Sequence, residues 1–113
     1  MSDDALLLDM LLAARQVSKY VSALIWERFA EDQAQQDAVA YQVQIIGEAA
    51  TRVSEEFRRA HPEIPWARIT GMRHRLVHNY RDVRHDVLWS TAQDAIPELI
   101  KLLEPLIPPE EES

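Results

Sequence analysis

Apolar residues in the first part of the chain recur at alternating spacings of three and four positions: Leu7, Met10, Ala14, Val17, Val21 and Leu24. An α-helix turns once every ~3.6 residues, so this spacing gathers the apolar side chains on one stripe. It predicts one long amphipathic helix reaching about Arg28. Ser2 is a suitable cap, and Asp3 and Asp4 place negative charge in the first turn. Only two of the 113 residues are glycine, which favours helices throughout the chain.

A second helix is expected from the polar stretch 31–37 to about Ala60. Its inner stripe includes Val39, Ile46, Val53 and Phe57. Gly47 lies inside this helix and costs roughly 1 kcal/mol relative to alanine, which is usually tolerated where another helix approaches closely. The clearest break in the chain follows, at His61-Pro62-Glu63-Ile64-Pro65, because prolines disfavour helix in the residues before them.

A short third helix begins at Pro65 and Trp66. A fourth is capped by Asp82 or Asp86, and Pro97 either kinks it or lies in the first turn of a terminal helix capped by Asp94. The predicted fold is therefore all-α, an up-and-down bundle of four to five helices. We expect a single domain over residues 1–107, followed by a disordered acidic tail over 108–113.

Composition excludes several classes of protein. The chain has no cysteine, so disulfides and thiolate metal sites are excluded. It has no run of 18 apolar residues and no basic segment of the kind that begins a signal peptide. A cytoplasmic protein without a membrane segment is the expectation.

Charge is unevenly distributed along the chain. The net charge of -7 argues against non-specific coating of nucleic acid. Residues 52–86, however, carry eight arginines against five acids, a balance of +3, whereas four basic residues and fourteen acids elsewhere give -10. Arginine grips phosphate or carboxylate at two points, although surface ion pairing would also explain such a block.

Residues able to bind an anion or move a proton gather at Arg73-His74-Arg75-Leu76-Val77-His78-Asn79-Tyr80. Histidine has an ordinary pKa of about 6.5, so both of its protonation states are available near neutrality. A nearby arginine holds an anionic substrate. A histidine and an arginine together are sufficient, in principle, to cleave a phosphodiester by proton transfer and charge stabilisation.

Helical geometry constrains this group. His74 and His78 are four residues apart and share one face, whereas Arg73 and His78 are about 140° apart around an ideal helix. Three arrangements bring them together: the helix loosens at His78, the long arginine side chain reaches round, or two copies of the helix meet across a twofold axis. The last is favoured, combined with some reach.

Non-catalytic roles remain open for these residues. Arg73 could pair with Asp82 or Asp86, and Tyr80 could simply pack at the helix end. His74 and His78 have the spacing of a helical metal pair. No acid lies between them, however, and the adjacent Arg75 repels a cation, so no metal site is expected.

The pattern Arg, four residues, His, any residue, Tyr at 73–80 resembles the signature of HepT-like toxins, a branch of the HEPN superfamily of helical ribonucleases. Further landmarks extend the resemblance over roughly residues 5–107: Ile45-Ile46-Gly47-Glu48-Ala49, Pro65-Trp66, Ile69-Thr70-Gly71-Met72, Val87-Leu88-Trp89 and Ile96-Pro97-Glu98-Leu99. The ordered set makes the match more specific than the motif alone.

The resemblance implies a homodimer that cleaves RNA without metal or cofactor, using the RNA 2′-hydroxyl as nucleophile. It assigns phosphate binding to Arg73, general acid or base chemistry to His78, and an assisting role to His74. Arg75 and Arg81 are predicted to help bind RNA.

The resemblance also implies the toxin of a type VII toxin–antitoxin system. Tyr80 matches the tyrosine that receives AMP from a partner nucleotidyltransferase of the minimal type, the antitoxin, and the added charge and bulk would block RNA entry. The alternative is a non-catalytic helical dimer that docks a nucleotidyltransferase.

Overall fold

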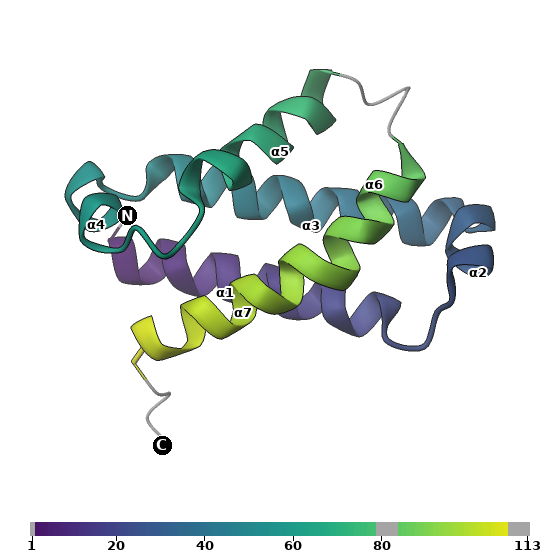
Figure 1. The fold of residues 1–113 in the computed structure, drawn as a ribbon, viewed down its shortest axis with the longest axis horizontal. Coiled ribbons are helices and arrows are strands. Elements are labelled where there is room, and N and C mark those ends of the chain that lie inside the picture. Colours follow the sequence, from purple (N-terminus) through teal and green to yellow (C-terminus); the bar gives the residue numbers. More distant parts are fainter. Residues whose placement is uncertain (1, 79–83, 109–113) are drawn as a thin grey trace.

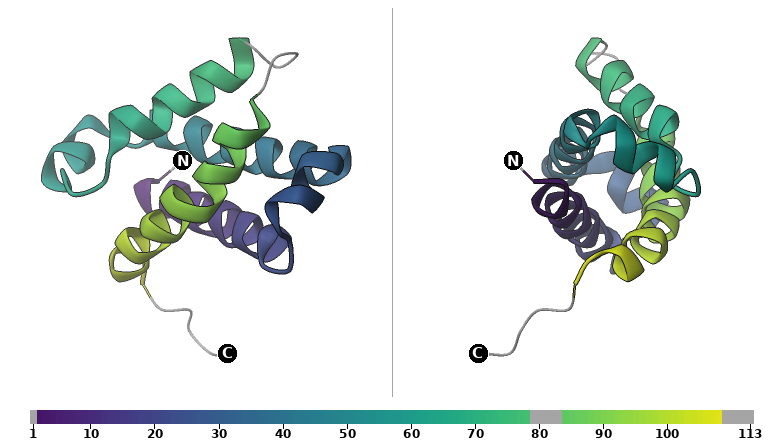
Figure 2. Two further views of the ribbon diagram at one scale, coloured as in Figure 1. Left: turned by 45° about the vertical axis from the view of Figure 1, so that its right-hand side comes forward. Right: turned by 90° about the vertical axis from the view of Figure 1, so that its left-hand side faces the viewer.

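The computed structural model describes residues 2–78 and 84–108, and within them every regular element is helical. Helix α1 (Asp3–Val21) packs along α3 (Gln33–Arg52). On this pair, α5 (Trp66–His78) lies against α3 and α7 (Ile96–Leu103) lies against α1. The chain passes along these layers in alternating directions, as Figures 1 and 2 show. The all-α, up-and-down prediction is confirmed.

The core is the predicted apolar stripe of α1 enclosed by α3 and α7. Leu7, Met10, Ala14 and Val17 of α1 are fully buried, as are Val39 of α3 and Leu103 of α7. Ser2 caps α1 as predicted, its side chain accepting a hydrogen bond from the Ala5 backbone N–H. The periodicity of the first helix therefore identified its buried face correctly.

The predicted end of the first helix is wrong. Helix α1 ends at Val21, and Leu24 lies in a turn where its N–H donates to the Val21 carbonyl. A separate helix, α2 (Trp26–Glu31), then places Phe29 in the core at 0% exposure. The break between α1 and α2 therefore accompanies the burial of Phe29.

The second predicted helix is divided as well. Helix α3 ends at Arg52, Val53 is extended, and the Ser54 side chain caps α4 (Glu55–Ala60) by accepting from the Phe57 N–H. Asp3 accepts hydrogen bonds from both the N–H and the hydroxyl of Ser54, at 2.9 and 2.6 Å. This contact ties the start of α1 to the start of α4.

The last helical segment changes pitch before Pro97. Helix α6 (His85–Ser90) runs into a π-helical stretch, η2 (Thr91–Ala95), and then into α7 with Pro97 in its first turn. The Ile96 N–H donates to the Thr91 carbonyl, five residues back. Proline clashes with the carbonyl four residues earlier, and this wider turn relieves the crowding.

The predicted caps of this segment are wrong where they can be compared. Asp86 lies in the first turn of α6 rather than at its cap, and no side-chain hydrogen bond from Asp94 caps α7. Asp82 lies outside the described residues, as do residues 109–113 of the predicted tail. A short 3₁₀ turn, η3 (Glu104–Leu106), follows α7.

None of the helices within residues 2–78 and 84–108 combines the length and apolar character that a bilayer crossing requires.

Candidate functional site

Helix α5 carries the candidate catalytic motif, and local hydrogen bonds fix where it begins. The Trp66 indole Nε1 donates to the His61 carbonyl at 2.9 Å, and the Trp66 backbone N–H donates to the Ile64 carbonyl. Ile64 itself is 1% exposed. The proline-rich break is therefore a folded turn anchored in the core, and it starts α5 at the predicted residue.

The first half of α5 is held against the bundle. Ile69 is buried, and α5 packs along α3. On its other side Met72 approaches η2, where the Thr91 hydroxyl lies 3.9 Å from the Met72 sulfur. These contacts set the direction in which the second half of α5 leaves the bundle.

The second half of α5 carries positions 73, 74, 75 and 78, and its backbone is helical through His78. All views in Figures 1 and 2 show the C-terminal end of α5 standing away from α3. The structure describes the side chains of α5 as far as Met72, so Arg73, His74, Arg75 and His78 are placed by their backbone positions. Tyr80 and Arg81 lie outside the described residues.

The helical backbone bears on one of the three arrangements considered for Arg73 and His78, in which the helix loosens at His78. Because α5 is helical through His78, the helix does not unwind before that residue. The two positions therefore remain about 140° apart around the axis. Reach of the arginine side chain and contact between two copies stay as predictions.

Ion pairing at the start of α6 bears on the structural alternative for Arg73. Arg84 donates to both carboxylate oxygens of Asp86, at 2.8 and 3.3 Å. The Arg84 hydrogen bonds hold the pKa of Asp86 below its ordinary value. The Asp86 carboxylate is thus engaged by its neighbour Arg84, and the pairing of Arg73 with Asp82 or Asp86 stays an open alternative.

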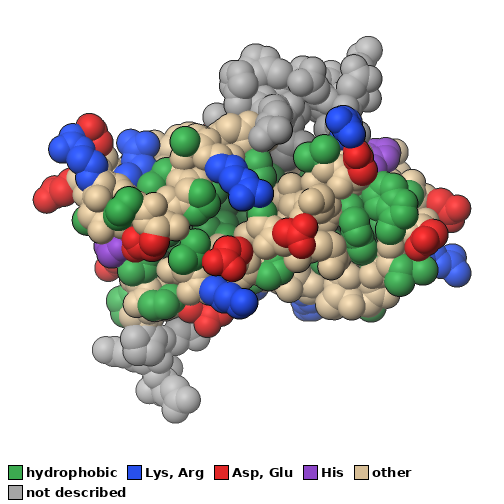
Figure 3. All heavy atoms as spheres, viewed as in Figure 1, with side chains coloured by type: hydrophobic (Ala, Val, Ile, Leu, Met, Phe, Trp, Pro, Cys, Tyr) green, Lys and Arg blue, Asp and Glu red, His purple; other side chains and the backbone are tan. Residues whose placement is uncertain are grey.

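Helix α5 is purely cationic: its thirteen residues include three arginines, two histidines and no acid. Arg68, which precedes the predicted motif, is exposed and makes no ion pair or hydrogen bond within the described part of the chain. Elsewhere on the face in Figure 3, basic and acidic side chains are interspersed. His, Asp and Glu side chains form no group of three suited to a metal among the described residues.

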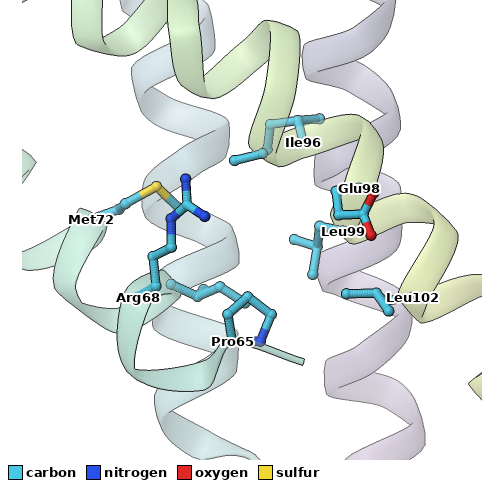
Figure 4. Close-up of a pocket in the computed structure, with 9 residues that line it drawn as sticks. Pro65, Arg68, Met72, Ile96, Glu98, Leu99 and Leu102 are labelled. Carbon is cyan, nitrogen blue, oxygen red and sulfur yellow. The ribbon is translucent and has the colours of Figure 1, made fainter. Parts of the chain in front are cut away.

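A small apolar pocket of about 50 Å³ lies beside Arg68, between α5 and the η2–α7 segment. Ile69, Met72 and Leu99 line it, and Glu98 lies on the α7 side (Figure 4). Its size suits a methyl group or a water molecule rather than a substrate. This pocket is therefore too small to serve as a substrate site.

Comparisons with known proteins agree on one family. The family model described as "Ribonuclease HepT-like" matches residues 10–106. A protein of Thermococcus cleftensis named "Probable ribonuclease HepT" is 37% identical over 91 residues, covering 80% of this chain and 83% of its own. No solved structure matches the chain significantly.

Two further relatives carry provisional RNase names. One, from Caldanaerobacter subterraneus subsp. tengcongensis, is 36% identical over 87 residues, covering 77% of this chain and 78% of its own. Another, from Methanocaldococcus jannaschii, is 32% identical over 103 residues, covering 91% of this chain and 89% of its own.

Proposed function

Because the chain belongs to the ribonuclease HepT-like family, we propose that it is a metal-independent endoribonuclease with Arg73, His78 and His74 as its catalytic groups. The observation that carries this proposal is the position of all three on the cationic, projecting half of α5. The relatives described above have ribonuclease names and match this chain over most of their length, which supports the same activity.

The proposed reaction uses the ribose as its own nucleophile. A neutral imidazole takes the proton of the 2′-hydroxyl while the 2′-oxygen forms a bond to phosphorus. A protonated imidazole gives a proton to the departing 5′-oxygen as its bond to phosphorus breaks. Arg73 binds the phosphate and stabilises the charge that develops on it. The products are a 2′,3′-cyclic phosphate and a 5′-hydroxyl.

The test of this activity is cleavage of labelled RNA by purified protein in EDTA. We expect His78→Ala and Arg73→Ala each to lower the rate by roughly 10²–10⁴-fold without changing the helical circular dichroism. A single 2′-deoxy substitution at the cleaved position should block cutting there. Cleavage that survives both alanine variants, or that depends on added metal, would contradict these roles.

A homodimer completes the proposed site, since Arg73 and His78 lie about 140° apart on one helix. Mixing Arg73→Ala chains with His78→Ala chains tests this arrangement. If the site combines groups from two chains, one site of each mixed dimer is intact and cleavage returns. If mixed dimers form and stay inactive, each chain supplies its own pair and the shared site is wrong.

The regulatory proposal concerns Tyr80. A nucleotidyltransferase antitoxin adds AMP to its hydroxyl and blocks RNA entry by bulk and negative charge, as in a type VII toxin–antitoxin system. Co-expression with a neighbour-encoded nucleotidyltransferase, followed by mass spectrometry, should show one or more AMP units on Tyr80. The Tyr80→Phe variant should gain no such mass and should keep cleaving RNA in the presence of the enzyme and ATP.

A second candidate is a non-catalytic dimer that docks a nucleotidyltransferase, and one surface favours it. Ile25, Trp26 and Val87 are 60%, 37% and 44% exposed, and the Trp26 ring lies 6.4 Å from that of Trp89. Exposed apolar surfaces of this kind often bind partners. A protein that forms the complex but neither cuts RNA nor slows growth would favour this second candidate.

A further inference from the structure

Four positions of α5 share one stripe of the helix. Positions 68, 71, 75 and 78 follow the spacing i, i+3, i+7 and i+10, which places them within an arc of about 80°. Ile69, which is buried against the bundle, lies about 100° from position 68. Position 68 borders the pocket on the packed side of α5, whereas positions 71, 75 and 78 lie about 120–180° from Ile69. The stripe therefore starts beside the bundle at Arg68 and then runs along a side of α5 turned away from the core.

Arg68 begins this stripe with an unpaired charge. It is exposed and has no ion pair or hydrogen-bond partner in residues 2–78 and 84–108. Figure 4 shows its guanidinium extending past Met72, while Glu98 lines the same pocket without forming an ion pair with it. A free guanidinium on an exposed helix is suited to binding an anion such as phosphate.

Gly71, one turn further along, has no packing role in the part of the chain that the structure describes. A Cβ built at this position would meet nothing within 4 Å. Glycine inside a helix is destabilising relative to alanine, and no neighbour in the described structure requires it here. Its bare backbone leaves room for a molecule that approaches from outside.

Charge decides which molecule fits this stripe. Arg68 and Arg75 lie on it, and α5 has no acid. A second copy of α5 on the same stripe would bring like charges together. An RNA strand brings a phosphate at every nucleotide and is therefore the complementary occupant.

We propose that the stripe Arg68–Gly71–Arg75–His78 is the track along which the RNA strand reaches the catalytic histidine. Positions 68 and 78 are about 15 Å apart along the helix axis. Successive phosphates of a stacked strand rise by about 3.4 Å. Arg68 therefore contacts a phosphate several nucleotides from the cleaved bond, and the enzyme prefers substrates long enough to reach it. This inference rests on the proposed ribonuclease function.

The experiment compares a dinucleotide with an oligonucleotide of about twelve nucleotides, long enough to span the track. We expect Arg68→Gln to lower kcat/KM about tenfold more on the oligonucleotide than on the dinucleotide, mainly through KM. The slope of log binding constant against log salt should fall by about 1. Gly71→Leu should likewise lower kcat/KM more on the oligonucleotide than on the dinucleotide, and its helical circular dichroism should be unchanged.

Two control variants separate this role from general charge and from ion pairing. Arg15→Gln removes the same charge from α1, and Glu98→Gln removes the carboxylate across the pocket. Both should cleave the two substrates as the unmodified protein does. The track would be overturned if Arg15→Gln lowered kcat/KM on the oligonucleotide as much as Arg68→Gln does. It would also be overturned if Glu98→Gln had the same effect on the two substrates as Arg68→Gln. If Gly71→Leu makes the protein monomeric, the stripe contacts a second copy of the chain and not RNA.

Binding of an uncleavable 2′-O-methyl oligonucleotide separates this inference from the proposed function. If the unmodified protein binds it but never cuts RNA, the ribonuclease proposal fails while the Arg68→Gln comparison still tests the track. If the protein cuts RNA and Arg68→Gln binds as tightly as the unmodified protein, only the track fails. If the unmodified protein neither binds this oligonucleotide nor cuts RNA, both proposals fail.

Discussion

Helices α1 and α5 both pack on α3, but their sequences serve different ends. Helix α1 has a serine cap, two acids in its first turn and eight buried residues. Helix α5 has no acid, and Ile69 is the one buried residue among its described side chains. In α1 nearly every feature stabilises the helix or the core. In α5, Arg68 and Gly71 have no such role in the described structure, which points to function on this helix.

The largest expected effect comes from breaking the core face of α1. Leu7 is fully buried, so Leu7→Ala should lower the free energy of unfolding by about 2–5 kcal/mol, through lost burial and the cavity left behind. Urea denaturation measures this change. Cleavage per folded molecule should be unaffected, because Leu7 lies on a helix that carries none of the proposed chemistry.

Leu12 gives the matched control on the same helix. It is 46% exposed, so Leu12→Ala should change the free energy of unfolding by no more than about 0.5 kcal/mol. If Leu7→Ala and Leu12→Ala lower the free energy of unfolding equally, the division of α1 into a buried and an exposed face is incorrect.

A smaller effect, opposite in sign, is expected in α5. Gly71→Ala should raise the free energy of unfolding by roughly 0.5–1 kcal/mol, since the new methyl group meets nothing and the helix gains propensity. Gly47→Ala is the counterpart at the other glycine of the chain. Gly47 is buried in α3, so an added methyl there should destabilise by about 1–3 kcal/mol.

Thermal or urea denaturation of both variants tests this contrast between the glycines. Destabilisation by Gly71→Ala would mean that the single chain needs a glycine at that position. The reason for expecting an outside molecule there would then disappear.

The sequence predicted the buried faces of the helices better than their ends. Periodicity located the stripe of α1, but it also continued smoothly through Leu24 and, in the second helix, through Phe57. In the structure both helices are interrupted. The first break precedes α2, which carries the buried Phe29, and the second precedes α4, which Ser54 caps. Ser54 followed by two acids is a helix-start signal that apolar spacing had outweighed.

The candidate site was predictable to a different degree. The HepT-like resemblance is confirmed by the family match, and α5 begins where Pro65 and Trp66 predicted. Arg68 was missed because it precedes the motif, although its spacing of seven from Arg75 was visible in the sequence. The proposed pairing of Arg73 with His78 across two copies stays a prediction, because periodicity within one chain does not specify how two copies meet.

The smallest expected effect is the pH dependence of stability at the acidic start of α1, a feature that the cationic α5 lacks. The Ser54 hydroxyl and backbone N–H, both donating to Asp3, hold the pKa of this carboxyl below its ordinary value of 3.8. A group whose pKa is lowered by folding stabilises the protein above its unfolded pKa. That contribution is lost as pH falls through the lower, folded value.

Urea denaturation from neutral pH down to about pH 3 should therefore show a loss of stability that Asp3→Asn reduces, because the asparagine side chain does not titrate in this range. Asp4→Asn, which alters the neighbouring acid of the same first turn, is the matched control and should leave most of the acid-dependent loss in place. If the two variants flatten the profile equally, the effect belongs to the charge of the helix end as a whole rather than to the contact between α1 and α4.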